Sequence, residues 1–445
     1  MFRRTTGTTL VALAWAALLG CGAAAVPAQA SAPPPGVEGW AGADGGTVTG
    51  GAGADPASVW TVRTRAELKE ALANHGDPTA PKVIRVAVDI DGAEADDGSG
   101  RLLGEQDYAP GYDRTKYMAC FGPDGTTWSD TRHDYCKQQR TLRQTGSNRQ
   151  KLQIQLTVPS NTTLEGTGEH ARLLGVFLTV NTGSNIIVRD LRLEAPVDHF
   201  TTWSPDDGDS GNWNARFDAM TVITGSRILI EHCTFTDGRF PDSRAPVGFH
   251  GKPVQRHDGL LDIEDGSNFI TVADSRFTDH DKALLIGSGD GRGDRDHGKL
   301  KITFARNWFH DIVQRAPRVR FGQVHAYNNL YTGARPLYAL GVGLESAIVS
   351  EKNVFAYEHS GYGTGSGSPT VVGALGGTAF HDKGSWIDGS PARLDAQAAE
   401  SIGTAYTSDT GWDPATAPGY TYRPLPTAAA VQSHVRHHAG PHPAA

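Results

Sequence analysis

The 445-residue chain has only four cysteines, and no two of them form a Cys-x-x-Cys pair. This argues against a thiolate metal site. Long hydrophobic runs are also missing, since the apolar stretch at residues 10–20 is too short to span a bilayer. The chain has no basic tail or stripe, and 49 acidic residues outnumber 41 basic ones. We therefore expect neither a nucleic acid nor a membrane as its partner.

The first thirty residues have the features of a secretory signal peptide. Arg3 and Arg4 precede the apolar stretch, and Ala-Gln-Ala at 28–30 is a small-x-small cleavage site. The sequence Leu-Leu-Gly-Cys at 18–21 loosely resembles a lipoprotein signal, but leucine before the glycine is atypical. We expect a secreted, extracellular protein, with lipid anchoring as the alternative.

Cleavage after residue 30 would leave 415 of the 445 residues and remove two arginines but no acidic residue, so the net charge moves from −8 to −10. This length is ordinary for a repeat architecture. In an exported chain we expect Cys120 and Cys136, which lie in a polar loop, to form a disulfide. Cys233 lies in an alternating apolar segment and is expected to be a buried free thiol.

Beyond residue 160, short β-branched segments recur and each ends in a large apolar residue. These ends, at 193, 235, 277, 309, 331 and 355, are 42, 42, 32, 22 and 24 residues apart. A base period near 22 with insertions is typical of a solenoid with loops on one face. The segments have no helical pattern. We predict an all-β fold, a right-handed single-stranded parallel β-helix with long loops on one face, and we expect a monomer.

Three asparagines, Asn307, Asn329 and Asn353, occupy the same place in successive repeats. Stacked one above another, they could hydrogen-bond to each other and to the turn backbone as a ladder. The alternative is that asparagine merely suits turns. Recurrence in register favours the ladder.

The segments outside the repeats are predicted to differ from them. The capping box Thr64-Arg-Ala-Glu67 indicates a short helix that caps the open end of the solenoid. Residues 91–148 are polar and poorly periodic, so we interpret them as a long excursion before the regular rungs. Residues 434–445 hold four histidines with Gly and Pro, and we expect a flexible tail, with metal binding as the alternative. The catalytic β-helix domain is then predicted at 35–433.

Three aspartates are candidate ligands for a hard cation. Asp258 and Asp262 lie in His-Asp-Gly-Leu-Leu-Asp, and Asp218 precedes a strand one repeat earlier. If the rungs stack with the 42-residue spacing, these carboxylates fall on neighbouring rungs. Calcium prefers several carboxylate oxygens. The pattern therefore indicates a Ca²⁺ site.

Basic residues follow on the next rungs. Lys282 is 20 residues beyond Asp262, and Arg315 and Arg320 flank Pro317. Residues one rung apart lie about 5 Å from each other. Cations beside an acid cluster are typical of a clamp for an anionic substrate.

The acid pair, the lysine and the Arg-x-Pro-x-x-Arg motif resemble the calcium-dependent, secreted bacterial pectate lyases of polysaccharide lyase family 1. Val158-Pro-Ser-Asn-Thr-Thr-Leu-Glu-Gly-Thr-Gly168 and His325-Ala-Tyr-Asn-Asn-Leu-Tyr331 extend the resemblance over nearly all the mature chain. It departs at Leu229-Ile-Glu-His232, where many relatives have Trp-Ile-Asp-His. It also departs at Arg216, where some relatives carry an acid, and this could change the calcium affinity.

The resemblance assigns a role to each candidate residue. It implies Asp218, Asp258 and Asp262 as calcium ligands, Lys282 and Arg320 as substrate-binding residues, and Arg315 as the catalytic group that removes a proton. The implied reaction is β-elimination on α-1,4-linked polygalacturonate, which gives 4,5-unsaturated oligogalacturonides. A free arginine has a pKa of about 12.5–13.8, so we predict an alkaline optimum.

Three other functions compete with this interpretation. Pectin lyases share the implied fold but act on methyl-esterified polymer without calcium, and they lack the acid cluster. Polygalacturonases hydrolyse with aspartates and have no Arg-x-Pro-x-x-Arg. A non-catalytic β-helical carbohydrate-binding protein or adhesin would have little reason to keep the acids, the lysine and the arginines together.

Overall fold

The structure is a computed structural model that describes residues 37–359 and 370–442. The predicted signal peptide at 1–30 lies outside the described residues. Residues from Val37 onward form one compact unit. Within the described ranges, no helix is both long and apolar enough to cross a membrane.

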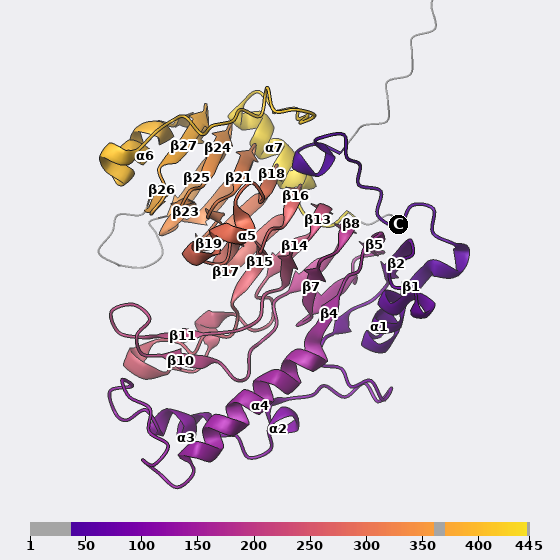
Figure 1. Ribbon diagram of the computed structural model, residues 1–445, viewed down its shortest axis with the longest axis vertical. Helices are drawn as coiled ribbons and strands as arrows, with labels where there is room; N and C mark the ends of the chain where they lie inside the picture. The colour runs from indigo at the N-terminus through magenta and orange to yellow at the C-terminus, as the bar shows by residue number, and fades with distance from the viewer. Residues whose placement is uncertain (1–36, 360–369, 443–445) are drawn as a thin grey trace, which may run out of the picture. The chain divides into compact units, whose positions relative to one another are not determined.

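The chain folds into a right-handed parallel β-helix whose strands stack in three rows (Figure 1). The first row is a ten-stranded parallel sheet. Its strands are β1 (Val59–Val62), β2 (Lys82–Val86), β5 (Thr162–Gly166), β8 (Ser184–Arg189), β13 (Ser226–Glu231), β16 (Asn268–Ala273), β18 (Lys301–Ala305), β21 (Gln323–Tyr327), β24 (Ala347–Glu351) and β27 (Ala379–Lys383).

The other two rows are linked into one sheet because β17 (Arg276–Ile286) runs through both. The second row contains β3 (Ile90–Asp91), β6 (Arg172–Leu174), β9 (Arg192–Glu194), β14 (Thr234–Thr236), β19 (Trp308–Gln314), β22 (Leu330–Ala334), β25 (Val354–His359) and β28 (Trp386–Ile387), with β29 (Ser390–Pro391) antiparallel beside β28. The third row contains β4 (Gln155–Thr157), β7 (Phe177–Asn181), β12 (Met220–Ile223), β15 (Gly259–Glu264), β20 (Arg318–Val319), β23 (Tyr338–Gly343) and β26 (Thr370–Leu375).

The large apolar residues that end each repeat lie in register in the second row. Phe235 pairs with Leu193 on one side and with Phe277 on the other, and the series continues to Phe309, Tyr331 and Phe355. From Phe235 onward the rings stack with centroids 4.4–5.1 Å apart and planes within 17° of each other. The repeat spacing therefore predicts the rungs correctly, and the stack forms part of one continuous core.

The asparagine ladder is present inside the turns between the first and second rows. Asn307 donates its backbone N–H and its side-chain Nδ2 to Asn329 Oδ1, at 2.9 and 3.1 Å. Asn329 donates in the same way to Asn353 Oδ1, at 2.8 and 3.0 Å. All three side chains are fully buried. The ladder prediction is confirmed, because each amide satisfies turn groups that water cannot reach.

The predicted capping helix is α1 (Arg65–Ala73). Thr64 Oγ1 accepts from the Glu67 backbone N–H at 3.2 Å, and the Glu67 side chain accepts from the N–H of Arg63 at 2.6 Å. Leu68 and Leu72 are buried against the first rungs. The amphipathic face of α1 thus packs on the apolar end of the solenoid.

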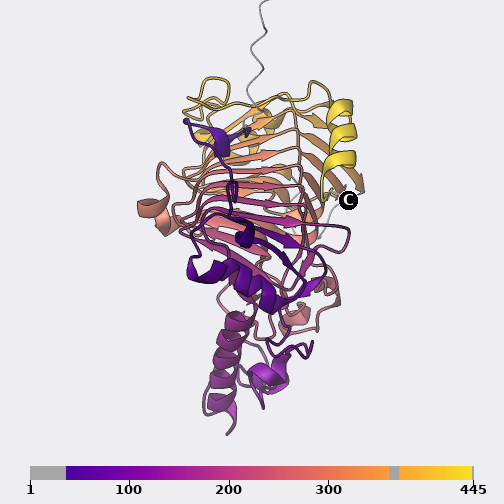
Figure 2. The same ribbon diagram turned by 90° about the vertical axis from the view of Figure 1, so that its right-hand side faces the viewer.

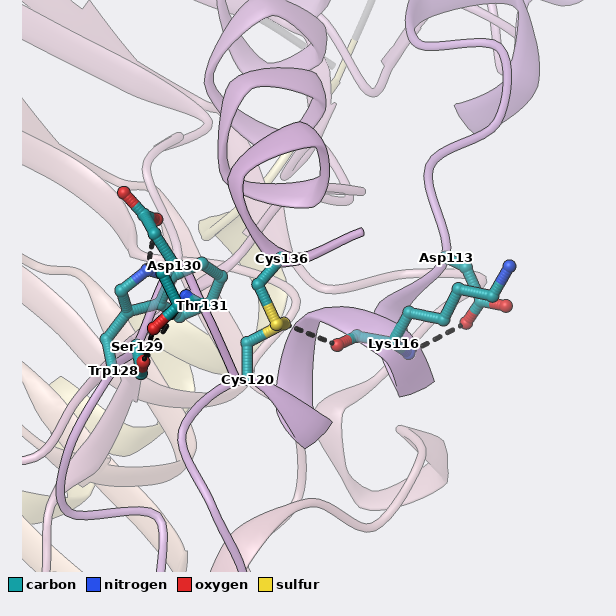
Figure 3. Close-up of a disulfide and its surroundings, with 8 residues drawn as sticks. All are labelled: Asp113, Lys116, Cys120, Trp128, Ser129, Asp130, Thr131 and Cys136. Atoms are coloured by element: carbon teal, nitrogen blue, oxygen red, sulfur yellow. Dashed lines mark hydrogen bonds between the residues drawn. A yellow bond between two sulfur atoms is a disulfide. The ribbon is translucent and has the colours of Figure 1, made fainter. Parts of the chain in front are cut away.

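The excursion contains more helix than we expected. It holds α2 (Glu105–Tyr108), α3 (Arg114–Ala119) and the 19-residue α4 (Cys136–Ile154), which extends away from the stacked strands (Figure 1). A disulfide joins Cys120 at the end of α3 to Cys136 at the start of α4 (Figure 3). The buried face of α4 is mostly small or polar, including Gln139, Gly146 and Gln150. It therefore lacks the apolar stripe that would indicate a helix in the sequence.

The loop between β9 and β12 completes this part of the molecule. It carries a hairpin of β10 (Thr202–Ser204) and β11 (Asn212–Asn214). Trp203 and Trp213 from the hairpin pack with Phe200, Phe249 and Tyr117 into a second, aromatic core. The excursion is therefore held by its own core beside the β-helix.

We predicted a flexible tail at residues 434–445, and this prediction was wrong for residues 434–438. These residues belong to α7 (Ala428–His438), whose Val431 and Val435 are fully buried with Leu330 and Val354. Figure 2 shows this helix, in yellow, alongside the stacked strands. The polar composition suggested disorder, but two valines four residues apart supply the apolar face that docks the helix. The remaining helices of four or more residues are α5 (Gly293–Asp296) and α6 (Leu394–Ile402).

Candidate active site

The strand register brings the predicted site residues to one corner of the β-helix. Four residues lie at one position of successive third-row strands: Thr221, Asp262, Leu285 and Arg318. Asp218, Lys282 and Arg315 each precede one of them by three residues.

Lys282 pairs directly with Gly259, which follows Asp258. Arg320 follows β20. Residues spread over about 100 positions of sequence thus meet where the second row turns into the third.

Two of the aspartates are buried and held by backbone groups. Asp218 Oδ1 accepts from the Gly259 N–H at 2.7 Å, and Asp218 Oδ2 accepts from the Thr221 hydroxyl at 2.6 Å. Asp262 Oδ1 accepts from the Leu285 N–H at 3.1 Å. The side chains of both aspartates are therefore fixed by neighbouring rungs.

The three carboxylates repel one another. Burial raises the pKa of Asp218 to about 7, and the charge of Asp258 adds to the shift. Burial also raises the pKa of Asp262 well above its usual range, with Asp218 and Asp258 as further causes and Arg315 opposing them. Carboxylates that destabilise each other in this way are a favourable environment for a cation.

The space between Asp218 and Asp262 is kept open by Gly259. A Cβ atom at this position would lie 2.7 Å from Asp262 Oδ1 and 2.9 Å from Asp218 Oδ1. Carboxylate oxygens from two rungs beside a glycine fit Ca²⁺, which takes oxygen ligands at about 2.3–2.6 Å. Within the described residues, no group of three His, Cys, Asp or Glu side chains is arranged to hold a metal ion as it stands. Asp258 is instead paired with Lys282.

Lys282 and Arg320 already contact acids. Lys282 Nζ is 2.9 Å from Asp258 Oδ1 and 3.2 Å from Gln255 Oε1. Arg320 Nε is 2.5 Å from Asp290 Oδ1, and its Nη1 donates to the Gly287 carbonyl at 3.1 Å. Both cations are thus positioned by groups that a substrate carboxylate could replace.

Arg315 has a different environment. Among the ion pairs of the described residues none involves Arg315, and its buried Nε has no hydrogen-bond partner. Its backbone is in the left-handed region with a φ of 59°, which is uncommon for a residue other than glycine. Tyr338 and Asp262 are its electrostatic neighbours. The guanidinium is therefore less neutralised than that of Arg320.

The sequence analysis missed several residues that build this corner. Arg318 lies inside the arginine motif, and burial followed by the charge of Arg320 lowers its pKa. His280 contacts Asp237 through Nδ1 at 2.6 Å and the Asp258 carbonyl through Nε2 at 2.9 Å, so it fixes the backbone of a candidate ligand. Arg318 could have been found from its motif. Gln255 and Asp237 lie in a long loop that has no recognisable pattern.

Known proteins resemble this chain over most of its length. A family model described as Pectate lyase matches residues 140–443. A pectate lyase of Bacillus subtilis (strain 168) is 37% identical over 410 residues, 91% of each chain. Pectate lyase E of Dickeya chrysanthemi is 35% identical over 366 residues, 80% of this chain and 77% of the relative.

Solved structures agree with the sequence comparisons. One described as a pectate lyase bound to hexasaccharide aligns with a TM-score of 0.79 and 35% identity. The alignment covers 91% of this chain and 96% of that one. The resemblance therefore includes both the β-helix and the corner that carries the candidate site residues.

Proposed function

The chain belongs to the pectate lyase family of polysaccharide lyases, and we propose that it cleaves polygalacturonate by calcium-dependent β-elimination. The observation that carries the proposal is that three carboxylates, a lysine and an arginine meet at one corner of the β-helix, and that this arginine has no ion pair among the described residues. Polygalacturonate is a polyanion, and a chain of net charge −8 needs such a local positive site to bind it.

Asp218, Asp258 and Asp262 are the residues that would hold calcium. When bound, Ca²⁺ supplies a Lewis acid beside the uronate carboxylate and so favours loss of the C5 proton. The three aspartates contribute the oxygen ligands, and Gly259 leaves room for the ion. Asp258 becomes available when the ammonium group of Lys282 turns to the substrate.

Lys282 and Arg320 bind substrate carboxylates. Their side chains are each only 11% exposed, so a carboxylate that reaches them is largely removed from water. Charge-assisted hydrogen bonds in such a place are strong. The two residues orient the sugar and neutralise charge that develops next to C5.

Arg315 is the residue that removes the proton. Its guanidine takes the proton from C5, the electrons of the C–H bond form the C4–C5 double bond, and the C4–O bond breaks so that the leaving oxygen keeps its electron pair and takes a proton from water. The products are a new reducing end and a 4,5-unsaturated uronate. Because a base acts only in its unprotonated form, the rate should increase toward alkaline pH.

We also propose that the protein is secreted. Residues 1–30 have the signal-peptide pattern, and a disulfide between Cys120 and Cys136 suits an oxidising compartment. Mass analysis of the culture supernatant would test this. A mature protein that begins at Ser31 is expected, and a product retained with the cells would contradict the proposal.

The activity test follows absorbance near 235 nm, where the unsaturated product absorbs. Polygalacturonate is incubated at alkaline pH with wild type, with and without excess chelator, and with Arg315→Ala. The control is Arg335→Ala, because Arg335 is partly exposed and its contacts among the described residues, an ion pair with Asp388 and a cation–π contact with the Tyr357 ring, involve no candidate site residue. Absorbance should increase for wild type and the control, and should be lost with chelator and with Arg315→Ala.

Each other outcome has a definite meaning. New reducing ends without absorbance would identify a hydrolase. Activity on methyl-esterified pectin that persists in chelator would identify a pectin lyase. Full activity of folded Arg315→Ala would remove Arg315 as the base.

A further inference from the structure

Four histidines gather where α7 docks on the β-helix, in a part of the molecule that the lyase site does not use. His434 and His438 are one turn apart on α7, with ring centroids at 4.6 Å. The His438 and His442 rings are 6.2 Å apart, and His442 is 5.6 Å from His232. His232 lies in the turn between β13 and β14. Three of the rings come from the C-terminal segment and one from the body of the solenoid.

Two of these rings already have the hydrogen bonds that accompany metal ligation. His434 Nε2 contacts Asp274 Oδ1 at 2.8 Å, and Asp274 is itself held by Arg306. His232 Nδ1 donates to the carbonyl oxygen of His438 at 3.0 Å. A histidine that binds a metal usually donates its other ring N–H to a carboxylate or a carbonyl. The remaining nitrogens, Nδ1 of His434 and Nε2 of His232, are therefore available as ligands.

The other two rings are exposed and are not fixed by hydrogen bonds among the described residues. Within the described residues, no ring nitrogen of His438 or His442 has a hydrogen-bond partner, and both residues are exposed. His437 differs, because its Nδ1 lies 2.6 Å from the Ser433 carbonyl of its own helix. Rotation of the exposed rings is needed for binding, since no three donors are placed around one point as they stand.

We propose that His434, His438 and His442, with His232 as a fourth ligand, bind a divalent transition-metal ion of the type that prefers imidazole, such as Zn²⁺. Two histidines at i and i+4 on a helix supply adjacent ligands on one face. Imidazole nitrogen suits Zn²⁺, Ni²⁺ and Cu²⁺, whereas Ca²⁺ prefers oxygen. The site is therefore distinct in chemistry and in place from the three aspartates. A bound ion would tie α7 to the turns of the solenoid.

The test titrates Zn²⁺ into the full chain by calorimetry, after removal of metals and in a buffer that contains millimolar Ca²⁺. The variant is His438→Ala/His442→Ala, because neither ring has a hydrogen bond to lose among the described residues. The matched control is His437→Ala on the same helix. Thermal unfolding with and without Zn²⁺ gives a second measurement, because a ligand bound only by the folded state raises its stability.

We expect one Zn²⁺ site in wild type that Ca²⁺ does not displace. Loss of a single hydrogen-bonding partner of a ligand costs about 10–100-fold in affinity, so the double variant should bind more than about 100-fold more weakly. The control should bind as wild type does, and Zn²⁺ should raise the unfolding midpoint only in wild type and the control. Absence of binding to wild type, equal binding by the double variant, or loss of binding in His437→Ala would each overturn the proposal.

Discussion

Gly259 shows how one residue sets the space for the proposed calcium site. A Cβ at this position would lie within 3 Å of an oxygen of Asp218 and of Asp262. Both side chains are held by backbone N–H groups and cannot move far. Gly259→Ala should therefore raise the calcium concentration needed for half-maximal activity by about 10-fold or more, as a misplaced ligand set does. Lyase rates measured across a calcium series give this value.

The control for this change is Gly104→Ala. A Cβ on Gly104 would meet nothing closer than 4.0 Å, and its φ of −122° suits alanine. The control should have the calcium dependence of wild type. An unchanged calcium requirement in Gly259→Ala would mean that the ion does not bind between Asp218 and Asp262.

A second residue, His325, links stability to pH. Its side chain is fully buried, and burial lowers its pKa even though Glu351 opposes the shift. A buried histidine whose folded pKa is below its unfolded value of about 6.5 stabilises the folded state at neutral pH. This contribution is lost as the pH falls from about 6.5 toward the folded pKa. The loss from this group is at most about 1.4 kcal/mol per pH unit.

Urea denaturation of wild type and His325→Gln at about pH 7.5 and pH 5.5 tests this linkage. The destabilisation caused by the substitution should be smaller at the acidic pH, because wild type has by then lost the contribution of neutral His325. Exposed His170→Gln serves as the control and should follow wild type. An equal difference between wild type and His325→Gln at both pH values would contradict the prediction.

At the scale of the elements, the asparagine ladder connects three turns. Asn329 accepts two hydrogen bonds from Asn307 and donates two to Asn353, all in a fully buried position. Asn329→Ala removes the acceptor of the buried Asn307 backbone N–H and the amide that donates to Asn353 Oδ1 and to the Phe304 carbonyl, although the backbone N–H of residue 329 still donates to Asn353. Each buried group left without a partner costs about 1–3 kcal/mol. We expect a loss of about 3 kcal/mol or more in the free energy of unfolding, measured by urea denaturation.

Asn181→Ala is the comparison for this prediction. Asn181 ends β7, its side chain is exposed, and its side chain makes no hydrogen bond within the described residues. Its replacement should change stability by no more than about 0.5 kcal/mol. If both substitutions had equally small effects, the ladder would be a consequence of the stacking and not one of its causes.

The elements that could be predicted from the sequence are those with a repeating environment. The same kind of aromatic neighbour recurs on every rung for Phe277, Phe309 and Tyr331. The spacing of these residues in the sequence therefore predicts the rungs. The helix α4 could not be predicted, because its buried positions such as Gln139 and Gln150 bond to loop backbone and not to an apolar core. Its signal depends on tertiary contacts that a local pattern does not contain.

The same distinction applies to the candidate site. The motif residues Asp262, Lys282 and Arg315 could be placed on neighbouring rungs because the register of a parallel solenoid fixes them. Asp237 and Gln255 could not, because both lie in a loop inserted between β14 and β15, where length and conformation are free to vary. Their roles depend on where that loop folds back onto the strands.

At the scale of the whole described unit, segments near the beginning and the end of the described residues cover the first row of strands. The N–H groups of Trp40 and Ala41 donate to Thr303 and Thr271, and the Tyr420 hydroxyl contacts Thr303 from the other end. These contacts shield side chains on the outer face of a sheet whose backbone is already paired. The C-terminal segment is thus part of the fold, and it fixes the backbone that carries its histidines.

Removal of α7 tests how much the solenoid depends on this segment. A chain that ends at Pro426 loses Val431 and Val435, both fully buried, and exposes Leu330 and Val354. Burial of a valine contributes about 1.5–3 kcal/mol, so the truncated chain should lose at least about 3 kcal/mol of stability. Its thermal midpoint, measured by circular dichroism, should decrease accordingly.

Activity should respond differently from stability in the same truncated chain. The helix α7 packs on β22 and β25 of the second row, whereas Asp218 and Asp262 lie on third-row strands or directly before them. The lyase rate per folded molecule at 25 °C should therefore stay within about twofold of wild type, because substitutions at sites that share no partners usually act independently. A chain that ends at His442 keeps α7 and should match wild type in both measurements. If the chain ending at Pro426 remained folded but lost activity, the docking of α7 would have to affect the positions of Asp218 and Asp262 through the intervening rungs.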